Sequence, residues 1–276
     1  MKNRNAKRII LAGAAAVLAV GVTACGGEEK KTDEKTITVA ASPTPHAEIL
    51  EEAKGLLKGK GYTLEIKEFD DYPQQNVVVD EGEFDANYFQ HQPYLDNFNE
   101  EKGADLVSAA KIHYEPLGIY PGASKDLEKI KDGAKIAVPN DATNEARALL
   151  LLEENGIITL KKDAGLNATK KDVKENPHQV EIVELDAAQI ARVVEELDFV
   201  VLNGNYALDA GFSVQTDAIA KEEADSEAAQ TYANIIAVKK ENKDSEKIKA
   251  LVEILQSEEI GKFIADTYEG AVVPMK

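Results

Sequence analysis

From about residue 36 onward, apolar and polar residues follow strand and helix periods in turn. Residues 37–41 form a short apolar run typical of a buried strand, and residues 46–57 place apolar side chains on one helical face after Pro45. Residues 62–69 alternate as a half-buried strand. Further strands are predicted at 135–138, 180–185, 199–202 and 232–238, an extended segment at 105–120, and helices at 76–80, 125–131, 144–155, 187–196, 245–256 and 258–268. Such alternation predicts an α/β fold with mostly parallel sheets covered by helices.

The length of this patterned region indicates two lobes. About 240 residues follow position 35, which is long for one doubly wound sheet and suits two units of ~100 to 120 residues each. The segments IHYEPLGIYPG and TYANIIAV are the best candidates for strands that pass between the units. We therefore predict a first lobe at residues 36–116 and 234–276 and a second lobe at residues 117–233.

One stretch, residues 84–98 (FDANYFQHQPYLDNF), breaks both periods. It places five aromatic side chains around His91, in a chain with 7 Phe, 9 Tyr and no Trp. Pro93 suits the first turn of a helix, so we expect a strand to Phe89, a tight turn and a helix at 93–102. Aromatic side chains at the carboxyl end of a strand would lie where α/β proteins bind ligands, and an aromatic-rich edge of the core is the alternative.

Residues 1–24 have the pattern of an export signal, because four basic residues precede an apolar run and a small-residue cleavage site. The only cysteine, Cys25, follows directly in VTAC, which is similar to a bacterial lipobox. We predict that Cys25 is the lipidated first residue of the mature protein, with residues 25–35 as a flexible tether. An uncleaved membrane anchor is the alternative, although the apolar run is shorter than the ~20 residues of a spanning helix. Acylated Cys25 would leave no thiol for a disulfide, catalysis or a metal.

The net charge changes which partners are expected. Removal of residues 1–24, which hold four basic residues and no acidic one, takes the formal charge from −18 to −22. A surface this acidic should repel nucleic acid, and it should also keep the domain off anionic lipid while the tether holds it near the membrane. Only two arginines follow residue 24, Arg147 and Arg192, so an arginine in a special position stands out.

Arg147 is the first candidate for a polar ligand contact. In residues 138–152 (VPNDATNEARALLLL), a strand and a turn lead into a helix near Asn144, whose main-chain N–H groups would favour an anion. Arg147 lies one turn into this helix and could clamp a carboxylate through two hydrogen bonds. An intramolecular salt bridge with a nearby Asp or Glu is the alternative, and for Arg192 a surface ion pair is the favoured interpretation.

Two asparagines are further candidates. Asn203 directly follows the predicted strand 199–202, where its side chain could bond a ligand amine or cap the next helix. Asn234 lies in the otherwise apolar strand TYANIIAV, where a buried amide needs partners. A ligand, a contact between lobes and a structural hydrogen bond all remain open for Asn234.

The motifs VTAC, SPTPHAEIL, FDANYFQHQPYLD, IAVPNDATNEARALLLL, FVVLNGNYA and YANIIAV, in this order, closely resemble the methionine-binding lipoproteins of the NlpA/MetQ type. This resemblance implies a two-lobed, periplasmic-binding-protein-like type II fold with a ligand cleft between its lobes. It also implies a lipid-anchored receptor on the extracytoplasmic face of the cell membrane. The receptor would bind L-methionine, a Met-containing dipeptide or a related amino acid and deliver it to the permease and ATPase of an ABC importer. Neither a cofactor nor an enzymatic activity is expected.

The resemblance further implies roles for eight side chains. Those expected around the methionine side chain are Tyr72, Phe89, His91 and Tyr94. Arg147 is expected to hold the carboxylate, with Asn144, Asn203 and Asn234 completing the contacts to the amino and carboxylate groups. The chain departs from the family pattern in the loop DDYPQQNVVVDEGEF and beside Arg147, where NEARAL places Glu145 and Ala146.

Other classes of protein fit the sequence less well. A hydrolase, a nucleotide-binding enzyme and a zinc protease would need G-x-S-x-G, a glycine-rich phosphate loop and HExxH respectively, and the sequence has none of these motifs. A zinc or manganese importer is the sharper alternative, because the chain contains His46, His91, His113 and His178. These histidines lie on separate predicted elements without the spacing of metal ligands, so no metal site is expected. A surface adhesin or structural lipoprotein would leave the position of Arg147 unexplained.

Overall fold

The computed structural model describes residues 34–224 and 227–275. The predicted export signal, the predicted lipidation site at Cys25 and most of the predicted tether lie outside the described residues. Within the described ranges, no helix is both long and apolar enough to cross a membrane.

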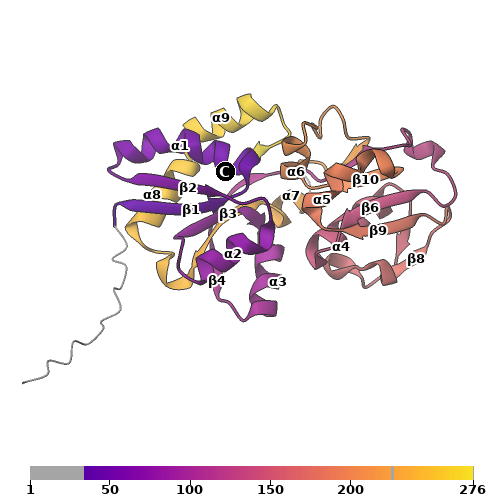
Figure 1. Cartoon of the computed structure of the whole chain (residues 1–276), viewed down its shortest axis with the longest axis horizontal. Helices are drawn as coiled ribbons and strands as arrows, with labels where there is room; N and C mark the ends of the chain where they lie inside the picture. The colour runs from indigo at the N-terminus through magenta and orange to yellow at the C-terminus, as the bar shows by residue number, and fades with distance from the viewer. Residues whose placement is uncertain (1–33, 225–226, 276) are drawn as a thin grey trace, which may run out of the picture. The chain divides into compact units, whose positions relative to one another are not determined.

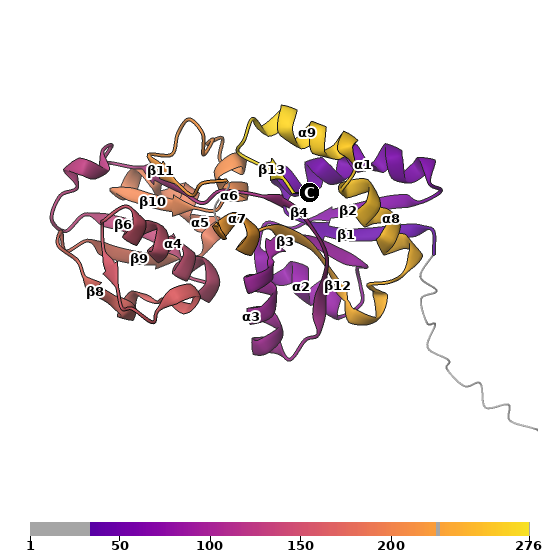
Figure 2. The ribbon, with the colours of Figure 1, turned by 180° about the vertical axis from the view of Figure 1, so that it is seen from behind.

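The first main sheet has six strands in the order β13-β4-β12-β3-β1-β2. It joins the beginning of the chain to its end, so indigo and yellow segments lie together in Figures 1 and 2. β1 pairs in parallel with β2 and with β3, whereas β12 runs antiparallel to β3 and β4, and β13 runs antiparallel to β4. The strands are β1 (Thr36–Ala41), β2 (Thr63–Glu68), β3 (Ala86–His91), β4 (Leu106–Tyr114), β12 (Asn234–Lys239) and β13 (Val273–Pro274).

The second main sheet has five strands in the order β11-β5-β10-β6-β9. β6 pairs in parallel with β9 and β10, and β5 runs antiparallel to β10 and β11. The strands are β5 (Gly118–Pro121), β6 (Lys135–Pro139), β9 (Glu181–Leu185), β10 (Phe199–Leu202) and β11 (Ala220–Lys221). A separate antiparallel pair consists of β7 (Thr159–Leu160) and β8 (Val173–Glu175).

Both main sheets are therefore mixed rather than mostly parallel. The parallel pairs are those joined by a helix, such as β1 with β2, and they follow the strand and helix alternation of the sequence. The antiparallel pairs arise because the chain leaves the first sheet along β4 and returns to it along β12, so the two neighbouring strands must run in opposite directions. Strand periodicity gives no sign of this direction, which depends on the path between the sheets.

Helices cover both faces of the first sheet. α1 and α8 pack together on one face, with α9 beside α1, while α2 and α3 contact β3, β4 and β12 on the other (Figure 1). The α-helices are α1 (Glu48–Gly59), α2 (Tyr72–Asp80), α3 (Gln92–Lys102), α4 (Ala142–Glu154), α5 (Ala187–Ile190), α6 (Gly204–Asp209), α7 (Glu227–Thr231), α8 (Glu246–Leu255) and α9 (Glu258–Tyr268). Shorter helical turns are η1 (Pro43–Ala47), η2 (Leu127–Lys129), η3 (Gly165–Asn167), η4 (Lys170–Asp172), η5 (Ala191–Glu196) and η6 (Lys240–Asn242).

Two predicted helices are much shorter than expected. The helix predicted at 125–131 is only the turn η2, in which the Asp126 side chain caps the N–H of Glu128. So short a segment forms too few helical hydrogen bonds to repay the cost of starting a helix. The helix predicted at 187–196 divides into α5 and the tighter turn η5.

The apolar core lies in and between these layers. One cluster of buried side chains includes Tyr88 of β3 together with Val200 and Leu202 of β10, so it contains residues of both main sheets. A second cluster joins β6 and β10 to the apolar centre of α4, including Leu149. The strands whose ends are described below are therefore anchored in buried apolar clusters.

Candidate functional site

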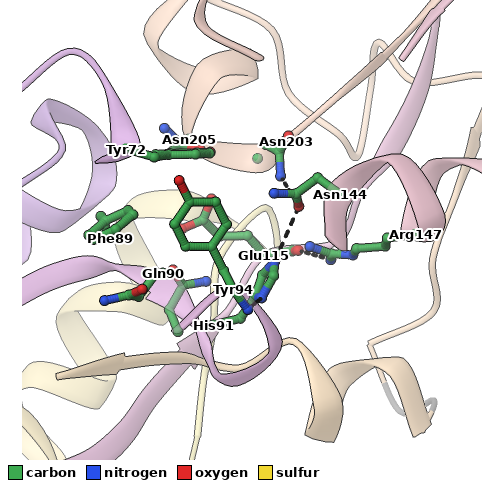
Figure 3. A pocket seen from close by; sticks show the side chains of 12 residues that line it. Tyr72, Phe89, Gln90, His91, Tyr94, Glu115, Asn144, Arg147, Asn203 and Asn205 are labelled. Atoms are coloured by element: carbon green, nitrogen blue, oxygen red, sulfur yellow. Dashed lines mark hydrogen bonds between the residues drawn. The ribbon is translucent and has the colours of Figure 1, made fainter. Parts of the chain in front are cut away.

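All eight side chains with an expected binding role line one pocket: Tyr72, Phe89, His91, Tyr94, Asn144, Arg147, Asn203 and Asn234. Figure 3 labels each of them except Asn234. Gln90, Glu115, Gly204 and Asn205 line it as well. The pocket lies where β3, β4, β6 and β10 have their carboxyl ends, which is the edge at which α/β sheets bind ligands. Its cavity volume is about 20 Å³, which is room for about one water molecule.

Three aromatic rings form one wall of the pocket. Tyr72 is the first residue of α2, Phe89 belongs to β3, and Tyr94 lies in the first turn of α3. The ring centroid of Tyr72 lies 5.4 Å from that of Phe89 and 5.7 Å from that of Tyr94, and the Phe89 and Tyr94 centroids are also 5.7 Å apart. The wall is thus a preformed apolar surface, because each ring supports the other two. Phe98, from the same aromatic stretch of the sequence, is instead buried in the core, at 6% exposure.

His91 connects this wall to the second sheet. It caps α3, because its Nδ1 accepts a hydrogen bond from the N–H of Tyr94 at 3.2 Å. Its Nε2 lies 3.1 Å from Oδ1 of Asn144 on α4. Burial, with the nearby charge of Arg147, lowers the pKa of His91 to about 3, so the ring is neutral and carries its proton on Nε2. The strand therefore continues to His91, and α3 begins at Gln92 without the predicted turn.

Asn144 organises the polar side of the pocket. Asp141 caps α4 by accepting from the main-chain N–H of Asn144, and it also accepts from the Asn144 side-chain amide. This capping explains why α4 begins at Ala142, earlier than predicted. The Asn144 Oδ1 accepts from the side-chain amide of Asn203 at 2.8 Å. The Asn203 Oδ1 is buried and has no hydrogen-bond partner among the described residues, so it offers an acceptor at the pocket.

Arg147 forms the intramolecular salt bridge that the sequence left open as an alternative. Its Nε and Nη2 atoms lie 2.8 and 2.5 Å from the carboxylate oxygens of Glu222, and Nη2 also donates to the main-chain carbonyl of Glu115 at 2.9 Å. The guanidinium stacks over the ring of Tyr232 at 4.3 Å. The third nitrogen, Nη1, donates to no acceptor within residues 34–224 and 227–275. The two-point clamp expected for a ligand is thus occupied by Glu222, and Nη1 is the nitrogen left for another acceptor.

Glu222 holds Arg147 firmly. Its carboxylate also accepts hydrogen bonds from the phenol of Tyr114 at 2.5 Å and from the N–H of Leu117 at 2.9 Å. Burial alone would raise the pKa of Glu222, but the charge and hydrogen bonds of Arg147 lower it. The pair is therefore ionised and fully bonded on the Glu222 side.

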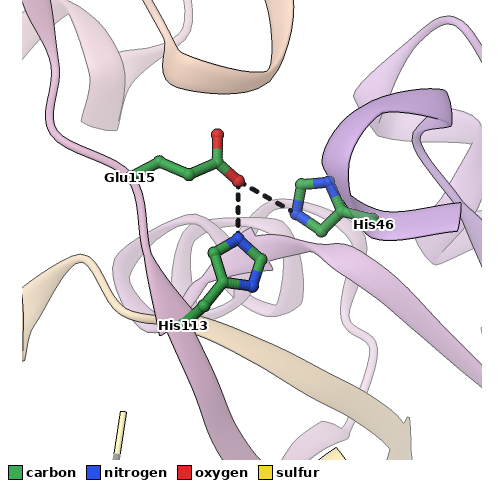
Figure 4. Close-up of side chains that lie close together, drawn as sticks. All are labelled: His46, His113 and Glu115. Atoms are coloured by element: carbon green, nitrogen blue, oxygen red, sulfur yellow. Dashed lines mark hydrogen bonds and ion pairs between the residues drawn. The ribbon is translucent and has the colours of Figure 1, made fainter. Parts of the chain in front are cut away.

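Glu115 is a pocket residue that the sequence analysis did not identify. Its Oε1 lies 2.7 Å from Nε2 of His113 and 3.4 Å from Nε2 of His46 (Figure 4). Two of the four histidines that the sequence places on separate elements, His46 of η1 and His113 of β4, are thus brought together. Burial lowers the pKa of His46 to about 4 and that of His113 to about 3, so both rings are neutral.

His46, His113 and Glu115 are also the group of described residues whose ligand atoms lie close enough, within 4.8 Å of one another, to be considered for a metal ion. These atoms are already engaged in hydrogen bonds. The remaining nitrogen of His113 bonds the phenol of Tyr88, and Nε2 of His46 lies 2.9 Å from Oδ1 of Asn234. The arrangement therefore acts as a hydrogen-bonded support for the Glu115 carboxylate.

Sequence signals for the missed residues were present but weak. Glu115 is an acidic residue within the apolar segment IHYEPLGIY, and Asn205 follows Asn203 by two residues in NGNYA. Neither pattern specifies a pocket, because only the pairing of β4 with β12 places Glu115 beside Asn234. Helix α6, which carries Asn205, was expected only as the helix that Asn203 could cap, without bounds, and the Asn203 side chain makes no capping hydrogen bond there.

The chain is similar to known proteins over nearly its whole length. The NlpA lipoprotein family matches residues 37–276. The methionine-binding lipoprotein MetQ of Bacillus subtilis (strain 168) is 43% identical over 274 residues, covering 98% of this chain and 99% of that protein.

Solved structures agree in sequence and in fold. A protein from Ruminococcus gnavus ATCC 29149 described as a lipoprotein is 67% identical, with a TM-score of 0.87 over 88% of this chain and 100% of that chain. A nutrient binding protein from Burkholderia cenocepacia bound to methionine is 42% identical, with a TM-score of 0.82 over 87% of this chain and 100% of that chain. The two-lobed binding-protein fold is therefore confirmed. On these similarities, the chain belongs to the NlpA lipoprotein family.

Proposed function

We propose that the protein is a membrane-tethered receptor that binds methionine in this pocket and delivers it to an ABC importer. The observation that carries the proposal is a single pocket that combines an aromatic wall with one arginine and several amide side chains. The similarity to a MetQ protein, and to a nutrient binding protein bound to methionine, supports the same ligand.

The chemistry of the wall suits the methionine side chain. A thioether gains ~0.3 to 1.5 kcal/mol from each favourable contact between sulfur and an aromatic ring. Tyr72, Phe89 and Tyr94 offer three rings, and the face of His91 lies beside them, with centroids of His91 and Tyr94 6.3 Å apart. Both nitrogens of His91 are engaged within the protein, so His91 contributes its ring surface and holds Tyr94 in place.

The polar side suits the amino acid head group. Nη1 of Arg147 receives the carboxylate, while Glu222 keeps the guanidinium oriented. Asn144 holds Asn203 and His91, and Asn203 Oδ1 supplies an acceptor. Asn234 completes the floor of the pocket through its bond with His46.

Ligand entry requires the two sheets to move apart. Methionine is far larger than the cavity of about 20 Å³, and bonds such as that between His91 and Asn144 join elements of the two sheets across the pocket. Methionine would bind with the pocket open and then favour closure, because it contacts residues from both sheets at once.

The location follows from the N-terminal sequence. Cys25 would carry the lipid, and residues 25–35 would tether the receptor to the extracytoplasmic face of the cell membrane, near the permease. The two lobes would be residues 36–116 with 234–276, and residues 117–233. In this role the protein is a solute receptor and not an enzyme.

Calorimetry on the purified protein, unfolded and refolded to remove bound ligand, tests the proposal. The panel comprises L-methionine, D-methionine, methionine-containing dipeptides, other amino acids, zinc and manganese. We expect the tightest binding with methionine. Binding of zinc or manganese without any response to methionine would refute the proposed ligand.

A further inference from the structure

Tyr232 contacts two pocket residues without lining the pocket itself. It lies between α7 and β12, shortly before Asn234, on the segment that returns from the second sheet to the first. The side chain is buried, at 4% exposure, but it is not one of the residues that line the cavity. Any effect of Tyr232 on a ligand must therefore pass through the residues that it touches.

The face of the Tyr232 ring supports Arg147. The guanidinium carbon lies 4.3 Å from the ring centroid, as in a cation–π contact. The bonds to Glu222 and to the Glu115 carbonyl hold the edge of the guanidinium that Nε and Nη2 form. They leave the group free to tilt about that edge, which would move Nη1, the nitrogen left for a ligand. The ring removes this freedom, because a guanidinium stacks on an aromatic face.

Tyr232 also connects Arg147 to the aromatic wall. Its ring meets that of His91 with the centroids 5.1 Å apart and the planes at 71°. His91 in turn caps the helix that carries Tyr94. Arg147 belongs to α4, which packs on the second sheet, whereas His91 ends β3 of the first. One side chain on the returning segment thus lies against both the arginine and the aromatic wall.

The hydroxyl of Tyr232 has no part in these contacts. It is buried and has no hydrogen-bond partner among the described residues. Tyr114, whose ring is also near the guanidinium, differs in this respect: its centroid lies 5.8 Å from the guanidinium carbon, and its hydroxyl bonds Glu222. A buried hydroxyl that bonds nothing does not stabilise the fold. The contribution of Tyr232 therefore comes from its ring.

We propose that Tyr232 is a positioning residue that holds the guanidinium of Arg147 at the angle at which Nη1 meets the ligand carboxylate. This inference rests on the proposed function and adds to it a residue outside the pocket. It makes the selection for a carboxylate depend on the aromatic ring at position 232 and not on the hydroxyl.

The test compares a ligand that has the carboxylate with one that lacks its charge. Calorimetry on the full chain measures L-methionine and L-methioninamide, which keeps the side chain and the ammonium but has a neutral amide. Wild-type protein should prefer methionine by roughly 100-fold or more, as for other buried charge pairs. Tyr232→Leu should reduce that preference by roughly tenfold, because the ring no longer supports the guanidinium. Tyr232→Phe keeps the ring and should keep both affinities.

Tyr120→Leu is the matched control. Tyr120 of β5 is also buried, with a hydroxyl that has no partner among the described residues, but it packs against Phe212 and does not line the pocket. Its substitution should lower stability and leave the preference for methionine over methioninamide unchanged. If Tyr232→Leu weakens both ligands by the same factor, Tyr232 is only a structural support and the inference fails. Loss of the preference in Tyr232→Phe would also overturn it.

Fluorinated phenylalanines at position 232 cover the case in which Tyr232→Leu does not fold. Fluorine atoms withdraw electron density from the face of the ring and weaken its attraction for a cation, with little change in shape. The preference for methionine should fall as fluorine atoms are added. A constant preference across the series, or equal affinity of the wild type for both ligands, would overturn the inference while leaving a methionine receptor intact. Absence of methionine binding to the wild type would instead refute the proposed function itself.

Discussion

The phenol of Tyr72 donates a hydrogen bond to the side-chain carbonyl of Asn205 at 2.5 Å. Tyr72 begins α2 on the first sheet, and Asn205 lies on α6, which follows β10 of the second sheet. Both residues line the pocket. A bond that joins the two sheets thus passes directly over the ligand site, and its loss should affect closure.

Tyr72→Phe should weaken methionine binding while keeping the aromatic wall. The substitution removes the hydroxyl and leaves the Asn205 carbonyl buried without its donor, which costs about 1 to 3 kcal/mol. The loss should appear as faster ligand release, measured by displacement kinetics. Tyr206→Phe is the control, because the Tyr206 hydroxyl bonds the Asp70 carbonyl at an exposed position. An equal effect of both substitutions would argue against a special role of the Tyr72 bond.

Arg147→Ala should weaken methionine binding by roughly 2 to 5 kcal/mol, because a buried charged contact to the ligand carboxylate is lost. Calorimetry measures the affinity, and circular dichroism checks that the variant is folded. Arg192→Ala removes the other arginine of the described chain, whose exposed side chain bonds only Gln189, at 3.3 Å, and should have no effect. Unchanged affinity of Arg147→Ala would show that Arg147 serves only its salt bridge with Glu222.

Glu222→Gln should destabilise the protein by about 3 to 5 kcal/mol, the usual cost of breaking a buried ion pair from one side. The reason is that Arg147, at 4% exposure, keeps its charge but loses its counterion. Urea unfolding without ligand measures the change. Lys262→Gln breaks the exposed pair of Lys262 with Asp266 and should leave the unfolding midpoint unaltered. A stable Glu222→Gln protein would mean that water or another group compensates Arg147.

His113 should make the protein less stable in mild acid. Its pKa is about 3 in the folded protein, against an ordinary value of 6.5, because burial disfavours the charged ring. Below about pH 6.5 the unfolded chain binds a proton that the native state does not, so the free energy of unfolding falls by up to about 1.4 kcal/mol per pH unit. Above that pH the contribution is complete and constant.

The measurement is urea unfolding between about pH 7 and pH 5, above the range in which ordinary carboxylates titrate. His113→Gln should have a smaller slope than wild type, and the pH dependence that remains should include His46 and His91, whose pKa values are also lowered by burial. Identical slopes for His113→Gln and wild type would contradict the assignment.

Gly204→Ala should reduce methionine affinity by roughly tenfold or more, about 1.4 kcal/mol. The added methyl group would lie 2.7 Å from the Glu115 side chain, so it must displace that carboxylate or the start of α6. Gly55→Ala in α1 meets no atom within 4 Å and should raise stability by about 0.5 to 1 kcal/mol with binding unchanged. Normal affinity in Gly204→Ala would show that the pocket tolerates a shifted Glu115.

The elements with clear periodicity were predictable from the sequence. β10 and α9 have the boundaries expected from the residues, because an apolar strand and an amphipathic helix are local patterns. Strand direction was not predictable, since it depends on how the chain passes between the sheets.

The contacts of the site that could not be predicted from the sequence also have a physical explanation. A special position of Arg147 could be inferred from the scarcity of arginine, but its partner Glu222 is 75 positions away and nothing local connects them. His46 and His113 looked unrelated because sequence spacing cannot show that η1 and β4 meet. Glu115 was missed for the same reason, although its neighbours Asn203 and Asn234 were recognised.

Glu115 and Asn234 lie where the chain crosses between the sheets. β4 ends at Tyr114 and β5 begins at Gly118, so Glu115 starts the outward crossing, while Asn234 is the first residue of β12 on the return. Any rotation of one sheet against the other must change main-chain torsion angles in these crossings. The floor of the pocket is therefore part of the hinge, and a substitution that twists either crossing should change ligand affinity without altering a single contact residue.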